Sequence, residues 1–247
     1  MSELAERRAE LAANLALVRT RIELACGQAG RDPHEVSLIV VTKYFPASDV
    51  RLLLDLGVHH YGENRDQEAG PKCAELRADA PAAPAVSSAP ELTMHFIGQL
   101  QTNKAGSVAR YADVVHTVDR PRLVSALDRG AQAAGRRLRA LVQVDLEPER
   151  DPNRGGARPE DALTIAEAVD TAAHLELGGV MAVAPLGADP DEAFAALGRV
   201  ARGIQVRFPS ASWVSAGMSG DLEAAVRHGA THLRVGTAIL GSRPHLR

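Results

Sequence analysis

The sequence predicts an α/β fold, a single (β/α)8 barrel of the TIM type preceded by one extra helix. Three observations lead to this fold class. Eight short apolar runs alternate with amphipathic stretches along the chain. Several runs are apolar at successive positions, which is typical of strands buried on both faces of a parallel sheet. The length of 247 residues also suits such a barrel, so we expect one domain over residues 1–247.

The extra helix covers about the first 25 residues. Its apolar residues recur at helical spacing and form one stripe, while Arg and Glu occupy the other faces. Gly27 and Gly30 end the helix, and Pro33 opens the next segment. The stripe consists of Leu4, Leu11, Leu15, Val18 and Ile22.

The rest of the chain reads as alternating strands and helices. The expected strands are the runs 36–41, 57–61, 94–97, 114–118, 140–144, 177–183, 212–216 and 233–235. The expected helices include 49–56, 122–134, 160–173, 190–206 and 222–228. A doubly wound sheet is the main alternative, but no GxGxxG follows the first strand and no GxxxxGK[ST] is present. The Ala/Pro/Ser-rich segment 78–90 is expected to be a surface loop.

Composition argues against several classes of protein. Hydrophobic residues make up 45% and charged residues 24%, with a net charge of -3, which argues against a general nucleic-acid binder. Cys26 and Cys73 stand alone, so neither a disulfide framework nor a metal site is expected. No apolar run is long enough to cross a membrane, and the N-terminus lacks the apolar core of a signal peptide. We therefore expect a cytoplasmic protein without membrane or nucleic-acid partners.

In a barrel of this type, functional residues follow the strands at their carboxyl ends. Polar or turn-forming residues follow or close each expected strand. Together at one rim of the barrel they indicate a functional site more strongly than any one of them does alone. These residues are Lys43, 62–64, Gln99, His116, Asp119, Asp145, Pro185, 217–220, Arg234, Gly236 and Thr237.

Lys43 directly follows the segment SLIVVT, which is apolar enough for a central strand. A lysine at such a strand end is partly desolvated. Desolvation disfavours the ammonium form and leaves the amine able to attack an aldehyde. The alternative is a strand-end lysine whose amine simply extends to water.

Two glycine-rich turns near the C-terminus predict an anion site. Gly217 and Gly220 flank Met218 and Ser219 before a helical stretch, and the dipeptide at 236–237 follows the last strand. Such turns present backbone N–H groups, and phosphate sites of these barrels commonly follow the seventh and eighth strands. An ordinary helix cap and turn would explain each piece alone. Asp221 and Glu223 argue against an anion here unless they point away.

Arg234 lies inside the last expected strand, between Leu233 and Val235. An arginine that points into a barrel is costly unless it is paired. Two interpretations stay open at this stage, a structural salt bridge and a role facing a ligand.

Several longer motifs occur together and in a specific order. From about Val36 to its C-terminus, the chain resembles the YggS/PROSC family of pyridoxal phosphate-binding proteins, also called pyridoxal phosphate homeostasis proteins. HFIGQLQTNK and the final block are the most specific segments. The motifs are VTKYFP, YGENRDQE, HFIGQLQTNK, HTVDR, VQVDLEPERDPNRGG, GVMAVAP and SAGMSGDLEAAVRHGATHLRVGTAILGSR.

The resemblance implies a fold-type III barrel that holds pyridoxal 5′-phosphate (PLP), similar to the N-terminal domain of alanine racemase. It implies that Lys43 forms the Schiff base, and that Ser219, Gly236 and Thr237 hold the phosphate. It further implies that Arg234 faces the pyridine nitrogen and that Asn64 lines the cofactor pocket. Relatives of this kind are monomers or weak dimers, so a monomer is expected.

Two functions compete. The first is a PLP carrier or buffer in vitamin B6 and amino-acid homeostasis, without turnover, whose expected recipients are PLP-dependent apoenzymes. The second is a PLP-dependent amino-acid racemase. Against the racemase, Arg234 would leave the ring nitrogen unprotonated and the ring a weak electron sink. The chain is also expected to lack the second domain that supplies a tyrosine base in racemases. A scaffold protein without a cofactor would leave Lys43, Ser219 and Arg234 without a shared purpose.

Overall fold

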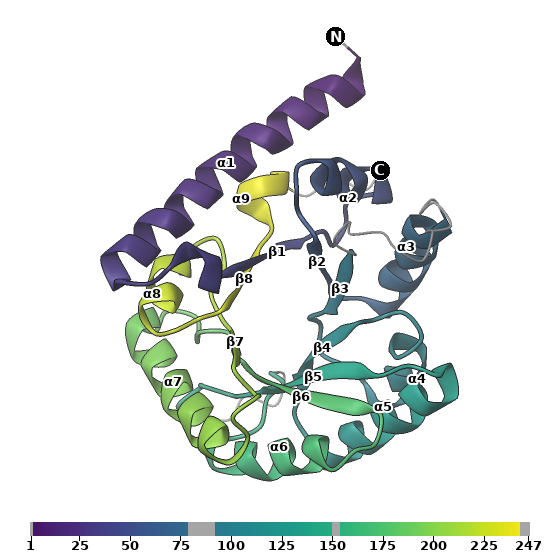
Figure 1. Ribbon diagram of the computed structural model, residues 1–247, viewed down its shortest axis with the longest axis vertical. Helices are drawn as coiled ribbons and strands as arrows, with labels where there is room; N and C mark the ends of the chain where they lie inside the picture. Colours follow the sequence, from purple (N-terminus) through teal and green to yellow (C-terminus); the bar gives the residue numbers. More distant parts are fainter. Residues whose placement is uncertain (1, 79–91, 150–153, 243–247) are drawn as a thin grey trace.

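A computed structural model describes residues 2–78, 92–149 and 154–242. Eight parallel strands pair with their neighbours in chain order and close into a barrel (Figure 1). This arrangement confirms the predicted (β/α)8 fold. The strands are β1 (Ser37–Val41), β2 (His60–Glu63), β3 (Thr93–Phe96), β4 (Val114–Val118), β5 (Leu138–Gln143), β6 (Leu175–Met181), β7 (Trp213–Ser215) and β8 (His232–Val235).

Helices surround the barrel, and the extra N-terminal helix is present (Figure 1). This helix begins after Ser2, whose side chain accepts a hydrogen bond from the amide of Ala5, and ends at Gly30 in the left-handed conformation. The helices are α1 (Glu3–Ala29), α2 (Ala47–Asp55), α3 (Asp66–Ala78), α4 (Ala105–Val108), α5 (Pro121–Ala134), α6 (Ala162–Asp170), α7 (Pro190–Arg207), α8 (Leu222–Arg227) and α9 (Thr237–Leu240).

The second strand lies later in the chain than predicted. The expected run was 57–61, whereas β2 spans His60–Glu63 and the chain at Gly57 turns with a positive φ of 78°. The helix α3, which contains Gly70 and Pro71, is not among the helices named from the sequence. Of the predicted loop 78–90, Ala78 is the last residue of α3 and the remainder lies outside the described residues.

The stripe predicted on α1 is buried with one exception. Leu11, Leu15, Val18 and Ile22 pack into the core, whereas Leu4 is 60% exposed. The start of α1 extends beyond the barrel, so its first turn has no helix to cover it (Figure 1). The packed part of α1 contacts α8 and α9 most closely.

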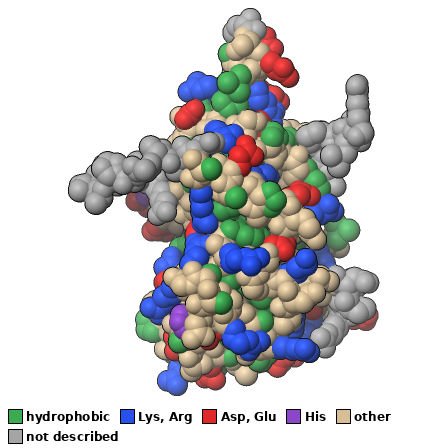
Figure 2. Space-filling model, turned by 90° about the vertical axis from the view of Figure 1, so that its right-hand side faces the viewer, with side chains coloured by type: hydrophobic (Ala, Val, Ile, Leu, Met, Phe, Trp, Pro, Cys, Tyr) green, Lys and Arg blue, Asp and Glu red, His purple; other side chains and the backbone are tan. Residues whose placement is uncertain are grey.

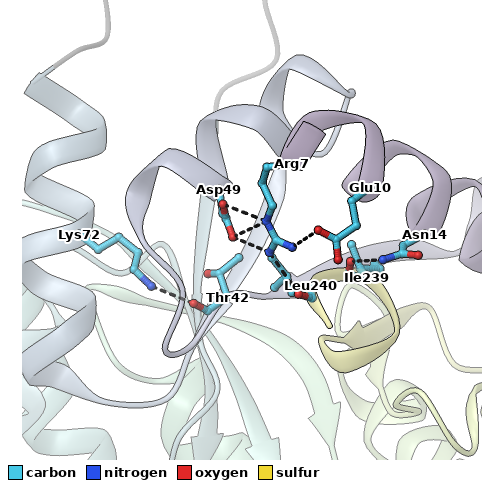
Figure 3. Close-up of polar contacts among 8 residues, drawn as sticks. All are labelled: Arg7, Glu10, Asn14, Thr42, Asp49, Lys72, Ile239 and Leu240. Atoms are coloured by element: carbon cyan, nitrogen blue, oxygen red, sulfur yellow. Dashed lines mark hydrogen bonds and ion pairs between the residues drawn. The ribbon is translucent and has the colours of Figure 1, made fainter. Parts of the chain in front are cut away.

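Polar contacts also fasten α1 to the elements that follow the first and last strands (Figure 3). The Arg7 guanidinium donates to Asp49 of α2 at 2.7 Å and to the Leu240 carbonyl of α9 at 3.1 Å. The Asn14 side-chain amide donates to the Ile239 carbonyl at 3.0 Å. These contacts join α1 to α2, which follows β1, and to α9, which follows β8, and β1 and β8 are neighbours in the closed barrel.

On the face shown in Figure 2, basic side chains are spread over most of the surface, with acidic and apolar side chains between them. None of the helices in the described part of the chain combines the length and the apolar character that crossing a bilayer requires.

We expect the packing of α1 to contribute strongly to stability. Leu15→Ala should lower the free energy of unfolding by about 2–5 kcal/mol, because it removes buried methyl groups and leaves a cavity. Leu17, which is 67% exposed on the same helix, provides the control, and Leu17→Ala should change stability by less than about 0.5 kcal/mol. Denaturant unfolding of the two variants measures the difference. Equal losses would show that α1 does not pack as described.

Candidate functional site

Lys43 lies two residues after the last residue of β1, at the carboxyl end of the strand where the sequence predicted it. Thr42 before it is fully buried, whereas Lys43 itself is half-buried. Tyr44 after it has a φ of 72°, a left-handed conformation that costs energy for a residue with a side chain. The turn therefore carries backbone strain at the position of the predicted Schiff-base lysine.

The chain contains three lysines, and their surroundings differ. Lys72 is buried, and its amine lies 2.9 Å from the Thr42 carbonyl (Figure 3) and 2.5 Å from Glu63 Oε1. The amine of Lys104 pairs with Asp66 at 3.8 Å. Lys43 has no hydrogen bond or ion pair with any described residue. Within the described ranges, the amines of Lys72 and Lys104 thus have acceptors, whereas that of Lys43 has none.

The cluster of Lys72, Glu63 and Thr42 next to this site was not predicted. Glu63 is fully buried and also accepts from the Thr42 hydroxyl at 2.6 Å. Burial raises the pKa of Glu63 above its ordinary value, and Lys72 opposes this shift. The cluster was missed because Glu63 was assigned to the residues that follow the second strand, and no helix was named around Lys72. The cluster anchors the segment that carries Lys43, since Lys72 binds the carbonyl of the preceding residue.

Asn64 follows β2 and is half-buried. Its side-chain Oδ1 is buried without a hydrogen-bond partner among the described residues. Gly98 allows this close arrangement, because a Cβ at that position would lie 2.0 Å from the Asn64 carbonyl oxygen. A buried polar atom without a partner is costly, so a ligand that supplies one would be stabilised here.

The two glycine-rich turns lie side by side after β7 and β8. The backbone amide of Arg234 donates to the Gly217 carbonyl at 2.9 Å, which joins the two strand ends. Gly217 has a φ of 90°, and a Cβ there would lie 2.6 Å from Ala225 Cβ. The backbone amides of Ser219, Gly220, Thr237 and Ala238 have no acceptor within the described residues. The turns thus offer several unused N–H donors at one edge of the barrel.

The acidic residues near these turns have other partners. Glu223 pairs with Arg21 of α1 at 2.8 Å, and the same guanidinium donates to the Ser219 carbonyl at 3.1 Å. Asp221 accepts from the amide of Met218 at 2.6 Å. Glu223 is therefore bound to α1, and Arg21 holds one of the two turns from outside.

Arg234 points into the barrel and is almost completely buried. Its guanidinium donates to Ser215 Oγ at 2.6 Å and to the Ala182 carbonyl at 2.8 Å. No described carboxylate forms an ion pair with it, which argues against a structural salt bridge. Burial lowers the pKa of Arg234 to about 10, while Asp221 acts in the opposite direction. The group keeps its charge at neutral pH, and the two bonds leave donors of its five-donor fork unused.

One predicted rim residue lies elsewhere. His116 was expected to close the fourth strand, but it lies within β4 and its side chain is fully buried in the barrel interior. Its Nδ1 is 3.0 Å from Ser215 Oγ, the group that binds Arg234. The error arose because strand residues of a narrow barrel alternate between interior and exterior, and polar interior residues interrupt the apolar run.

The six predicted site residues follow or lie on four neighbouring strands, β7, β8, β1 and β2. Arg234 is within β8, Gly236 and Thr237 follow it, and Ser219 follows β7. Lys43 and Asn64 follow β1 and β2. The closed barrel therefore collects one amine, one buried guanidinium, one unpartnered amide and two turns with unused N–H donors on a single arc of its rim.

Fold and site together define a barrel protein of the alanine racemase type. The family model "Alanine racemase, N-terminal domain" matches residues 33–244. Alanine racemase from Corynebacterium glutamicum superposes with a TM-score of 0.65 at 14% identity, over 94% of this chain and 60% of that protein. At this identity the likeness concerns the fold alone.

Relatives at higher identity narrow the family. The pyridoxal phosphate homeostasis proteins of Mycobacterium bovis and Escherichia coli are 45% and 34% identical over 98% and 96% of this chain, and over 96% and 98% of their own lengths. PipY of Synechococcus elongatus, solved with PLP bound, is 34% identical with a TM-score of 0.77, over 94% of this chain and all of that one. The chain belongs to the pyridoxal phosphate homeostasis protein family, which confirms the resemblance seen in its motifs.

Proposed function

We propose that this protein binds PLP as a Schiff base on Lys43 and acts as a carrier or buffer of the cofactor. The observation that carries the proposal is the free amine of Lys43 at the rim, beside a buried guanidinium and two turns with unused N–H donors. These residues match three of the polar groups of PLP, namely its aldehyde, its pyridine nitrogen and its phosphate. The names of the relatives, and the PLP bound to PipY, support the same cofactor.

Each residue has a proposed role. Lys43 supplies the amine, and the backbone amides at Ser219, Gly236 and Thr237 bind the phosphate. Arg234 donates a hydrogen bond to the pyridine nitrogen, and Asn64 lines the pocket with its unpartnered amide. When bound, PLP can exchange its imine with the amine of an amino acid.

A carrier of PLP would not turn over amino acids at a useful rate, and several residues of the site agree with this. Arg234 keeps its proton at neutral pH, so it leaves the pyridine nitrogen unprotonated and gives a carbanion little stabilisation. Two of the tyrosines cannot serve as the second base of a racemase, because Tyr61 is buried against Cys73 and the Tyr111 hydroxyl donates to Asp66 at 3.0 Å. The curated relatives are named as homeostasis proteins. We further propose a cytoplasmic monomer that supplies PLP-dependent apoenzymes.

Borohydride reduction tests the Schiff base. The purified protein with PLP should absorb in the visible range, and reduction should fix the cofactor on the peptide that contains Lys43, because the other two lysines are held by acceptors. Lys43→Ala should lose the adduct while it keeps some non-covalent affinity through the phosphate site. Lys104→Ala is the control and should retain it. A reducible adduct that persists in Lys43→Ala would refute the assignment.

A comparison of vitamers tests the phosphate site. Pyridoxal, which lacks the phosphate, should bind more than about tenfold more weakly than PLP, because it cannot use the backbone donors of the two turns. Inorganic phosphate should compete with PLP for the same donors. Equal affinities for PLP and pyridoxal in a titration would show that the turns do not bind phosphate.

Incubation with single L-amino acids tests the absence of turnover. We expect a spectral change as the amino acid exchanges with Lys43, but no sustained product, since Arg234 leaves the pyridine nitrogen unprotonated and neither Tyr61 nor Tyr111 is free to move a second proton. D-enantiomer, keto acid and amine are measured over many hours. Multiple turnovers that vanish in Lys43→Ala would favour the racemase or a related enzyme.

A further inference from the structure

Three histidines and a serine form a continuous row of hydrogen bonds behind Arg234. His60 Nδ1 lies 2.9 Å from His95 Nε2, and His95 Nδ1 lies 2.8 Å from His116 Nε2. His116 Nδ1 is 3.0 Å from Ser215 Oγ, which accepts from Arg234 at 2.6 Å. We call the side chains of Arg234, Ser215, His116, His95 and His60 the interior chain.

The stagger of the barrel strands produces this row. His95 on β3 pairs in register with Gly62, two residues beyond His60 on β2. His116 likewise lies two residues beyond Val114, the partner of His95. Each step therefore climbs about 6.6 Å along the strands. His116 then reaches across the barrel interior to β7, where Ser215 contacts it.

The two ends of the interior chain differ in exposure. His95, His116 and Ser215 are completely buried. His60 is half-buried and lines a cavity of about 610 Å³ that also includes Ser37 and Leu38 at the start of β1. One end thus reaches solvent at the amino-terminal side of the barrel, and the other lies at the candidate cofactor site.

The hydroxyl of Ser215 sets the direction of every bond. It contacts Arg234, which can only donate, and His116 Nδ1. A hydroxyl could accept from both groups, but its own proton would then have no acceptor among the described residues, which is costly in a buried position. We therefore assign the hydroxyl proton to His116 Nδ1. His116 then carries its proton on Nε2 and donates to His95 Nδ1, and His95 in turn donates from Nε2 to His60 Nδ1.

We propose that Ser215, His116, His95 and His60 are positioning residues for Arg234, joined in a one-way chain of neutral rings that each carry the proton on Nε2. In this arrangement the lone-pair end of each ring points toward the guanidinium and the N–H end points away. The aligned dipoles stabilise the buried cation in place of a carboxylate and hold it at one orientation. Arg234 can then present its unused donors to a ligand at the rim.

The charged and titratable groups around the rings favour their neutral form. Burial is the largest cause that lowers the pKa of His95, followed by His116, His60, His232 and Arg139. Burial, then Arg234 and His232, lower the pKa of His116. Burial and His59 lower that of His60. His232, whose pKa burial lowers to about 3, is itself neutral at ordinary pH.

Nitrogen NMR of the full-length apoprotein tests the direction of the chain without any cofactor. With ¹⁵N-labelled histidine, the rings of His95 and His116 should each show a protonated Nε2 and an unprotonated Nδ1 at pH 7 and still at pH 5. His95→Gln and His116→Gln identify the signals. A proton on Nδ1 of either ring at pH 7, or a charged ring, would overturn the proposal.

Variants at both ends test the positioning role. Ser215→Ala should speed the exchange of the Arg234 N–H protons with water, and Ser215→Thr, which keeps the hydroxyl, should restore their protection. His60→Phe should change the ring signals of His116, whereas His59→Phe, in the same cavity but outside the chain, should not. If His60→Phe and His59→Phe leave these signals equally unchanged, His60 has no positioning role.

The last measurement rests on the proposed cofactor. Ser215→Ala should weaken PLP binding by about tenfold, the loss expected for one hydrogen bond to a charged group, and Ser215→Thr should recover it. Unchanged affinity in Ser215→Ala would show that the chain does not act on the ligand. If the wild-type protein itself fails to bind PLP, the proposed function fails, while the ring protonation of the apoprotein still decides the proposed chain.

Discussion

The interior of this barrel is organised around one buried charge, the guanidinium of Arg234. A cation removed from water without a partner is costly, and the usual remedy is a carboxylate. Here a serine hydroxyl and the Ala182 carbonyl accept from it instead. Several other features follow from this arrangement. Ser215, the last residue of β7, lies next to the guanidinium. Buried histidines stand at interior positions of β3 and β4, where apolar residues would be usual, so a row of polar side chains crosses the barrel interior.

A second constraint acts from outside, through α1. This helix precedes the barrel in sequence, yet its side chains bind elements near the other end of the chain, the Ser219 turn through Arg21 and α9 through Arg7 and Asn14. Both turns with unused N–H donors are therefore held by contacts more than a hundred residues apart in sequence. Short helices such as α8 and α9 are not stable alone, so packing against α1 is what holds their N–H groups in place.

The sequence was sufficient to predict the fold class, because strands buried on two faces and amphipathic helices leave strong periodic signals. It also predicted the residues at strand ends, Lys43 among them, since the carboxyl ends of parallel strands share one rim. It failed where a polar residue lies inside a strand. Glu63 was assigned to the turn after its strand and His116 to the rim of the barrel, whereas their partners Lys72 and Ser215 come from distant segments. Such pairings depend on register and stagger, which no local pattern in this sequence reports.

That no described carboxylate pairs with Arg234 also bears on what the site can do. A carboxylate would neutralise the guanidinium, whereas the Ser215 hydroxyl and the Ala182 carbonyl are neutral acceptors and leave it a net positive charge. A guanidinium that keeps its proton can donate a hydrogen bond to an unprotonated pyridine nitrogen, and its positive charge favours a phosphate nearby. It does not suit reactions that need a proton delivered to the ring nitrogen. In the proposed function, the buried cation that makes the interior of the barrel costly to build therefore favours holding PLP over using it in catalysis.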